Sequence, residues 1–299
     1  MIKYATKYLN PIFMKYKLLS EIKYEATNIY GIATGTKIDE LFYIIEQKNG
    51  NIIKKSLGGI PNLSVINIVG VPDTGKSLLA EQFAIFQANK NNRILYVTVE
   101  SPACFLYNSM KLKSEYLNIN FKDISKNIVV IDASENSELR EEPKILMETM
   151  DSAIKNNNTN ITIIDSITGL YEHKEIMARQ IVRIFFNFLK KWKQTGIFIS
   201  QKRSSQQETS AEAAGGLAVA HIVDGTIVMD KKLIETYWDS KLYNMQIGNV
   251  LRTLRIDGCR LTGHDSRTWV YEITDGGTIN IVSPLEQFLN KKYNDYGSN

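Results

Sequence analysis

The chain has 299 residues, of which 43% are hydrophobic and 23% are charged, and its formal net charge is +4. This composition is typical of a globular protein with one large domain, or one domain with an extension. So mild a charge does not by itself indicate a nucleic-acid or membrane partner. The two cysteines, Cys104 and Cys259, are too few for a zinc ribbon and suggest no disulfide framework, which favours a reducing, cytoplasmic compartment. No run of 18 apolar residues predicts a membrane span, and no secretory signal is visible.

Residues 1–30 are expected to form an N-terminal extension, helical and solvated. Between Lys3 and Lys23 the extension is basic and rich in tyrosine, so a weak membrane-surface or nucleic-acid arm is the alternative interpretation.

From about Ser64, short β-branched runs alternate with helix-length segments. This alternation predicts an α/β fold with a mostly parallel sheet and helices on both faces. The predicted strands are Val65–Val69, Ile94–Val99, Ile128–Ile131, Ile161–Ile164 and Gly196–Ser200. A crossover helix is predicted within residues 175–194, where apolar residues recur at spacings of three and four. They are Met177, Ile181, Ile184, Phe185, Phe188, Leu189 and Trp192.

The segments after Gly225 change in character, because short strands and turns replace the helices. Antiparallel strands at the edge of the sheet are predicted at Thr226–Met229, Val250–Ile256, Trp269–Thr274 and Thr278–Val282. Asn49-Gly50, the favoured pair for a tight turn, predicts an inserted hairpin at about residues 43–56. The expected domain therefore covers residues 31–285, and residues 286–299 form a C-terminal tail.

One motif predicts a phosphate site. The sequence Gly70-Val71-Pro72-Asp73-Thr74-Gly75-Lys76-Ser77 fits G-x-x-x-x-G-K-[ST], directly follows a predicted strand and precedes a helix that starts near Leu78. Backbone N–H groups and the helix N-terminus would surround the phosphates of a nucleotide, Lys76 would reach the β- and γ-phosphates, and Ser77 would bind Mg²⁺. The alternative is a chance glycine turn with a surface lysine. Asp73 is unusual, because a carboxylate beside phosphates is unfavourable unless it points outward.

Three polar residues follow predicted strands and would complete an ATPase. Asp165 would hold Mg²⁺ through water, with a helix N-cap as the alternative. Glu100 would polarise the attacking water, with a solvated loop acid as the alternative. Gln201 would hydrogen-bond the γ-phosphate, although a polar residue after a strand is common.

Further segments extend this pattern over residues 31–282. They are Gly58–Pro61, Thr98–Glu100, Ile164–Thr168, Ile199–Gln201, Gly215-Gly216, His221–Asp224, Arg252–Arg255, Arg260, Thr262, His264 and Ile279–Ile281. Together they resemble the KaiC branch of the RecA superfamily and, more distantly, the bacterial RadA ATPases. The resemblance implies a RecA-type core that binds ATP and Mg²⁺ at the interfaces of a homo-oligomeric ring, usually of six subunits.

In such rings a Lys-x-Arg element reaches the ATP of the neighbouring subunit. The corresponding residues here are Gly258-Cys259-Arg260, so the resemblance implies that Arg260 acts in trans, with His264 near the neighbour's nucleotide. The lysine is missing, and Glu100 is followed by Ser101 where the family often has a second acid. Residues 217–223 contain no serine or threonine, which excludes autophosphorylation of the clock type at that position.

The leading hypothesis is an ATP-hydrolysing switch or motor with an unknown protein partner and no membrane partner. One alternative is a DNA-binding recombination or branch-migration ATPase of the RadA type. Its channel loop would be Lys202–Glu212, whose two basic residues are followed by two acids and no aromatic residue, so nucleic acid is not favoured. The other is a nucleotide-gated scaffold with little turnover, which Gly258 and Ser101 favour.

Overall fold

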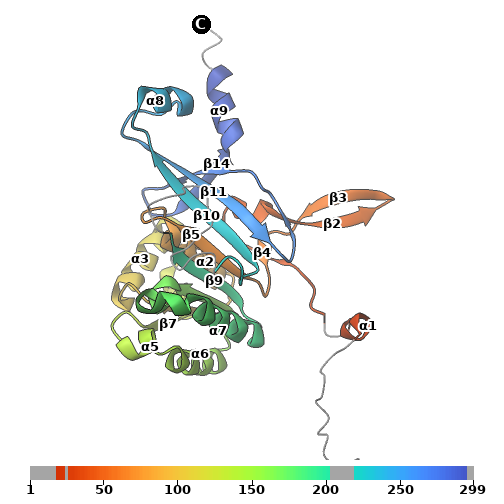
Figure 1. Ribbon diagram of the computed structural model, residues 1–299, viewed down its shortest axis with the longest axis vertical. Coiled ribbons are helices and arrows are strands. Elements are labelled where there is room, and N and C mark those ends of the chain that lie inside the picture. The colour runs from red at the N-terminus through yellow and green to blue at the C-terminus, as the bar shows by residue number, and fades with distance from the viewer. Residues whose placement is uncertain (1–17, 24–25, 203–218, 295–299) are drawn as a thin grey trace, which may run out of the picture.

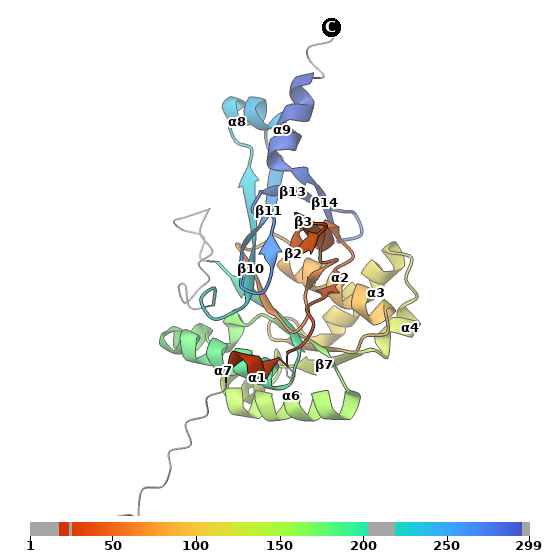
Figure 2. The ribbon, with the colours of Figure 1, turned by 90° about the vertical axis from the view of Figure 1, so that its right-hand side faces the viewer.

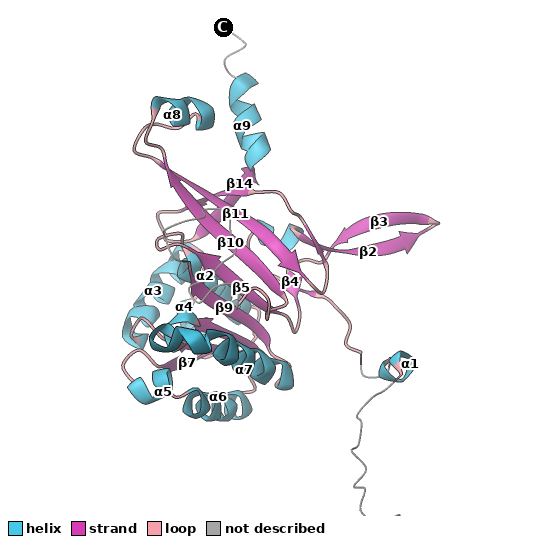
Figure 3. Cartoon of the chain, in the orientation of Figure 1, coloured by secondary structure: helices cyan, strands magenta, loops and turns pink. Residues whose placement is uncertain are grey.

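The computed structural model describes residues 18–23, 26–202 and 219–294. Its centre is a nine-stranded sheet with the strand order β14-β13-β11-β10-β5-β9-β8-β6-β7 (Figures 1 and 3). The strands from β10 to β7 run parallel, and β11, β13 and β14 continue the sheet antiparallel. These strands are β5 (Val65–Gly70), β6 (Ile94–Thr98), β7 (Ile128–Asp132), β8 (Ile161–Asp165), β9 (Thr195–Gln201), β10 (Gly225–Leu233), β11 (Val250–Cys259), β13 (Trp269–Ile273) and β14 (Ile279–Pro284).

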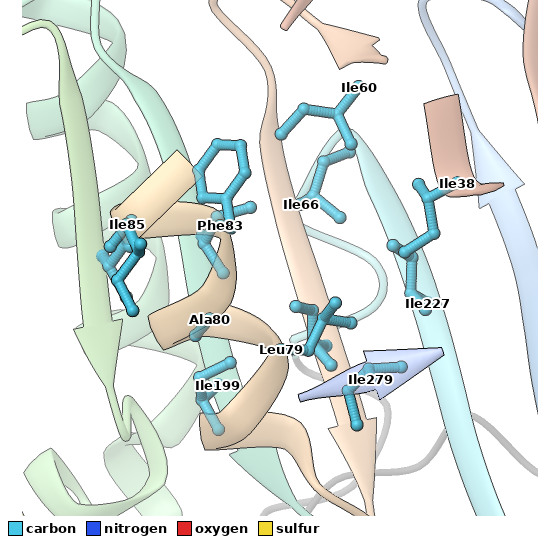
Figure 4. Close-up of a cluster of buried hydrophobic side chains, with 14 of the residues drawn as sticks. Ile38, Ile60, Ile66, Leu79, Ala80, Phe83, Ile85, Ile199, Ile227 and Ile279 are labelled. Atoms are coloured by element: carbon cyan, nitrogen blue, oxygen red, sulfur yellow. The ribbon is translucent and has the colours of Figure 1, made fainter. Parts of the chain in front are cut away.

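Helices cover both faces of the sheet, which confirms the predicted α/β fold. One core cluster joins the sheet to α2 (Lys76–Asn89), α3 (Ala103–Tyr116) and α4 (Phe121–Ser125). Figure 4 shows Leu79 and Phe83 of α2 on the side toward Ile66 of β5, and Ala80 near Ile199 of β9, all within this cluster. A second cluster on the other face includes α6 (Pro143–Asn157) and α7 (Ala178–Lys191), with α5 (Ser137–Glu141) beside them. Strands covered in this way carry continuous apolar runs, which is why β5 and β6 are buried at every residue.

The direction of β10 differs from the prediction. Thr226–Met229 is predicted as an antiparallel edge strand, but the structure places it inside the sheet, parallel to β5 and antiparallel only to β11. The segment Gly225–Met229 is buried throughout, as in other strands that are covered on both faces. An apolar run records burial and not strand direction, so the prediction is wrong for this segment.

The crossover helix α7 is shorter than its predicted range. It begins at Ala178, after a 3₁₀ segment, η3 (Glu172–Met177). Ile181, Phe185 and Leu189 are buried against the sheet, whereas Met177 lies outside the helix and is 41% exposed. The apolar stripe therefore packs as expected only from the first turn of the helix onward.

A hairpin of β2 (Phe42–Lys48) and β3 (Asn51–Ser56) projects from the side of the molecule (Figure 1). Asn49 and Gly50 at its turn have left-handed φ angles of +52° and +79°, the conformation of a type I′ turn. Every residue of β3 is exposed. The short strand β12 (Gly263–His264) pairs with β2, and β1 (Gly31–Ile32) pairs with β4 (Ile60–Pro61).

Two of the remaining helices lie together at one end of the molecule. Figure 2 shows α8 (Tyr237–Tyr243) and α9 (Leu285–Asn294) together at the end opposite α6 and α7. The others are α1 (Leu19–Ile22), η1 (Lys37–Glu40) and η2 (Thr168–Leu170). Most of the predicted basic extension, residues 1–17, lies outside the described residues. Within the described part of the chain, no helix has the length and apolar character needed to cross a bilayer.

Candidate functional site

The predicted phosphate loop joins β5 to α2 through residues 71–75. Asp73 and Gly75 have left-handed φ angles of +62° and +84°. A Cβ atom on Gly75 would lie 3.0 Å from the side chain of Ile279, so glycine suits both the conformation and the space. Aspartate tolerates this backbone region better than most residues do. Helix α2 begins at Lys76, directly after this loop, and a helix N-terminus is a favourable place for an anion.

Lys76 lies across this loop. Its Nζ donates a hydrogen bond to the carbonyl oxygen of Val71 at 2.9 Å, and Thr74 Oγ1 donates to the same oxygen at 2.9 Å. The Lys76 side chain is buried, and burial lowers its pKa, although the negative charge of Asp165 opposes the change. An anion bound in the loop would offset the cost of burying this ammonium group.

Asp165 ends β8 beside the first turn of α2. Its Oδ1 accepts a hydrogen bond from Ser77 Oγ at 3.1 Å, and its Oδ2 accepts one from the Tyr96 hydroxyl at 2.8 Å. Burial raises the pKa of Asp165 to about 6, and the hydrogen bonds from Tyr96 and Ser77 act in the opposite direction. The Asp165 carboxylate and the Ser77 hydroxyl are hard oxygen donors of the kind that Mg²⁺ takes, directly or through water.

Glu100 follows β6, and Gln201 ends β9. Gln201 Nε2 lies 3.0 and 3.1 Å from the two carboxylate oxygens of Glu100, and Ser166 Oγ donates a hydrogen bond to one of these oxygens. The backbone N–H of Gln201 donates to Thr168 Oγ1 at 3.0 Å. Because β6, β8 and β9 are parallel neighbours, the residues at their carboxyl ends meet at one edge of the sheet. The structure thus brings Glu100, Asp165 and Gln201 to the same edge as the phosphate loop.

Two pockets open at this edge. The larger, of about 940 Å³, extends from the phosphate loop over β10, β11 and β13, and Lys76, Leu233 and Ile273 are among its lining residues. The smaller, of about 240 Å³, includes Ser77 and Glu100. Small-molecule sites typically occupy about 300–1,000 Å³. The larger pocket therefore has the size of a nucleotide site, and the smaller one brings the predicted base next to it.

Arg260 and His264 lie away from the phosphate loop of their own chain. The pairing of β11 with β10 places Cys259 level with Ile66 at the start of β5, whereas the phosphate loop follows Gly70 at its end. That separation along β5 is about 13 Å at roughly 3.3 Å per residue. Arg260 is exposed and donates a hydrogen bond to a main-chain carbonyl at 2.6 Å. His264 pairs with Phe42 of the hairpin strand β2. Neither Arg260 nor His264 is among the residues that line the two pockets at the phosphate loop of the same chain.

Three further residues reach the site without a local sequence pattern that marks them. Tyr96 lies inside an apolar strand and is 1% exposed, so the sequence alone indicates a core residue. Lys231 and Arg252 line the larger pocket because β10 and β11 pair in one register. Arg252 does lie in the segment Arg252–Arg255, which contributes to the KaiC resemblance, but nothing in the resemblance assigns it to the phosphate site, and Lys231 lies in none of the resembling segments. A register between strands depends on distant segments, so only the fold reveals these positions.

The predicted channel loop is described only at its first residue. Lys202 is buried, with its Nζ 3.8 Å from Asp230 Oδ1, so it is not available to the phosphates of DNA. Residues 203–218, which include Arg203 and Gly215-Gly216, lie outside the described residues. Among the described residues, no group of three or more His, Cys, Asp and Glu side chains could hold a metal ion.

The fold and the polar residues at its carboxyl edge can be compared with known proteins. The sequence model of the KaiC ATPase family matches residues 32–286. The chain belongs to the KaiC ATPase family. This match confirms the resemblance inferred from the sequence, and membership of an ATPase family supports a nucleotide-binding function.

Related proteins are similar over most of their length. The UPF0273 protein of Thermotoga maritima is 26% identical over 234 residues, which cover 74% of this chain and 89% of the relative. The UPF0273 protein of Pyrococcus furiosus is 28% identical over 240 residues, or 74% and 87% of the two chains. The crystal structure of a KaiC-like protein from Pyrococcus horikoshii OT3 has a TM-score of 0.64 and 20% identity, and the match covers 85% of this chain and 100% of that one. At this identity the crystal structure supports the KaiC-like fold alone.

Proposed function

We propose that the protein binds Mg-ATP at the phosphate loop and hydrolyses it as a cytoplasmic homo-oligomer that works as a switch or motor. The observation that carries this proposal is the convergence of Lys76, Ser77, Asp165 and the hydrogen-bonded pair Glu100–Gln201 at one edge of the sheet. Membership of an ATPase family supports the choice of ATP as the nucleotide.

The binding step uses groups that are already positioned. The backbone of residues 71–75 and the start of α2 favour an anion, and the Lys76 ammonium is held at this loop by a 2.9 Å hydrogen bond to the Val71 carbonyl. Ser77 and Asp165 fit Mg²⁺ by their donor chemistry, because one hydroxyl and one carboxylate match the oxygen ligands that Mg²⁺ prefers. Held by Ser77 and Asp165, a Mg²⁺ ion would supply positive charge that offsets the negative charge developing during phosphoryl transfer.

The chemical step is assigned to Glu100 and Gln201. Glu100 would accept a proton from water as the water oxygen attacks the γ-phosphorus and the bond to the ADP oxygen breaks. Gln201 Nε2 contacts both carboxylate oxygens of Glu100, so the amide holds the orientation of the base. The exposed Arg260 of a neighbouring copy would supply planar donors to the γ-phosphate in a ring, of six subunits by resemblance.

A nucleotide-gated scaffold with little turnover is a second candidate, favoured by one observation. Both Gln201 and Ser166 donate hydrogen bonds to Glu100, so the carboxylate that would activate water is already engaged. Gly258, where the resemblance has a lysine, points the same way. The DNA-dependent motor has less support, because Lys202 is buried beside Asp230.

A turnover assay distinguishes these functions. Phosphate release from ATP is measured for the parent and for Glu100→Gln, each with and without single-stranded DNA, together with ATP affinity. The expected result is DNA-independent turnover that falls in Glu100→Gln while affinity is kept. Unchanged turnover in Glu100→Gln would remove this residue from the mechanism. ATP binding without turnover in the parent would instead establish the scaffold.

A further inference from the structure

Two cations face each other beside the phosphate loop. Lys231 of β10 and Arg252 of β11 are direct partners in the antiparallel ladder, so their side chains leave the same face of the sheet. The ladder with β5 sets Met229 level with Gly70, and Lys231 lies two residues further along, where the phosphate loop begins. Both side chains line the larger pocket together with Lys76.

This arrangement is unfavourable without an anion. Like charges directly opposite each other in a ladder are destabilising. Among the described residues that line the larger pocket, the only acid is Asp73, whose Oδ2 lies 3.3 Å from Lys231 Nζ and whose side chain is 85% exposed. The buried Nε of Arg252 has no hydrogen-bond partner in the described structure. Asp165 and Glu100 act on Lys76, whereas the described lining of the pocket sets Lys231 and Arg252 against one largely hydrated carboxylate, that of Asp73.

We propose that Lys231 and Arg252 form a cis-acting cation pair that binds the phosphates of the nucleotide at the P-loop, with Asp73 holding Lys231 in place. This inference rests on the proposed function. A phosphate between the two side chains would replace their repulsion by charge-assisted hydrogen bonds, including two parallel ones from the guanidinium group. In the resemblance, a lysine at the position of Gly258 reaches the ATP of the neighbouring subunit. That lysine is missing here, and the pair would supply a cation from the same chain instead. The proposal also explains why the phosphate loop tolerates an acid at Asp73, because the Asp73 carboxylate contacts Lys231.

The competing explanation is that Lys231 serves only to neutralise Asp73. A double-mutant cycle separates the two, because Asp73→Asn removes the carboxylate while asparagine tolerates the same left-handed backbone. If Lys231 contacts the nucleotide, its removal weakens binding in both backgrounds. If it acts only on Asp73, its removal has no effect once the carboxylate is gone.

The experiment measures the affinity for Mg-ATP of the parent, Lys231→Met, Asp73→Asn and the double variant by calorimetry. The matched control is Lys232→Met, which removes the same charge one residue along, from a side chain paired with Asp239 at 2.8 Å. We expect Lys231→Met to weaken binding about 10-fold or more in both backgrounds, as for other hydrogen bonds to charged groups, and Lys232→Met to leave it unchanged. The proposal would be overturned if Lys231→Met weakened ATP binding only in the protein that retains Asp73. An equal loss of affinity in Lys232→Met would also overturn it.

Arg252 is tested with two variants, because its side chain also packs inside the sheet. Arg252→Lys should keep more of the affinity than Arg252→Met, although both have similar stem packing; equal affinities would exclude Arg252 from the phosphate site. Lys76→Ala, in the same titration, tests the proposed function separately. If Lys76→Ala binds Mg-ATP like the parent, the nucleotide site itself is wrong. If Lys76→Ala loses binding and Lys231→Met does not, only the cation pair is wrong.

Discussion

Replacing Asp165 by asparagine should stabilise the nucleotide-free protein. The carboxylate accepts hydrogen bonds from Ser77 and Tyr96, but burial raises its pKa to about 6. The ionised group is therefore less favourable in the folded chain than in the unfolded one. Asparagine has the same shape and carries no charge, so Asp165→Asn removes this cost together with the negative charge that would attract Mg²⁺.

The size of the effect follows from the pKa of Asp165. A rise from the ordinary value of 3.8 to about 6 corresponds to about 3 kcal/mol at 1.36 kcal/mol per unit. Because the folded-state pKa is the higher one, the folded protein retains the proton longer, and this contribution to stability is lost as pH rises through about 6. Asp165→Asn should thus gain up to about 3 kcal/mol at pH 8 and about half of that at pH 5. These are upper values, because part of Asp165 borders the smaller pocket and is screened by water.

The assay is urea unfolding at pH 8 and pH 5, without nucleotide and with a chelator. Asp265→Asn is the control of opposite sign, because the hydrogen bonds from Arg267 lower the pKa of Asp265. A group with a lowered pKa stabilises the fold above its unfolded pKa, so Asp265→Asn should lose stability at pH 8. No gain for Asp165→Asn at pH 8, or the same gain at both pH values, would refute the reasoning.

Two other predictions concern the stability of the fold, one for a buried ion pair and one for an apolar core residue. Lys113→Met should cost about 3–5 kcal/mol in urea unfolding, because it leaves Glu81 buried without the cation that lies 2.9 Å away; Lys111→Met, which removes an exposed ion pair at 4.0 Å, should cost less than about 1 kcal/mol. Similar losses in these two variants would contradict the buried pair. Leu189→Ala should cost about 2–5 kcal/mol, since Leu189 is fully buried between α7 and the sheet. The control is Ile52→Ala on the projecting hairpin, where the side chain is 76% exposed, so stability should change by about 0.5 kcal/mol or less. A loss in Ile52→Ala as large as that in Leu189→Ala would contradict the assignment of these two residues to surface and core.

Local patterns predict much of the fold and part of the candidate site. The apolar runs of β5, β6 and β8 mark buried strands, and each of them is followed by a polar residue or by the glycine-rich loop. Once those strands are placed parallel and adjacent, their carboxyl ends must meet. The proximity of Asp165, Glu100 and Gln201 therefore follows from the chain order and the burial of the strands.

The remaining features depend on contacts between distant segments. The direction of β10 is set by its pairing with β5, and the positions of Lys231 and Arg252 follow from its register with β11. Lys202 directly follows a strand in a predicted exposed loop, yet it is buried beside Asp230 of β10. Hydrophobic periodicity records how much of a segment is buried and not which neighbour buries it, so none of these positions is encoded locally.

The central claim, that ATP is hydrolysed at a site shared by two copies of the chain, is tested most directly by mixing two inactive variants. Lys76→Ala removes the cation of the P-loop, and Arg260→Ala removes the residue proposed to act in trans, so each oligomer alone should release no phosphate from ATP. In an equal, random mixture, about one quarter of head-to-tail interfaces combine an intact Lys76 with an intact Arg260. We expect phosphate release to return to about that fraction of the parent rate. A mixture as inactive as either variant, while the parent is active, would contradict the shared site.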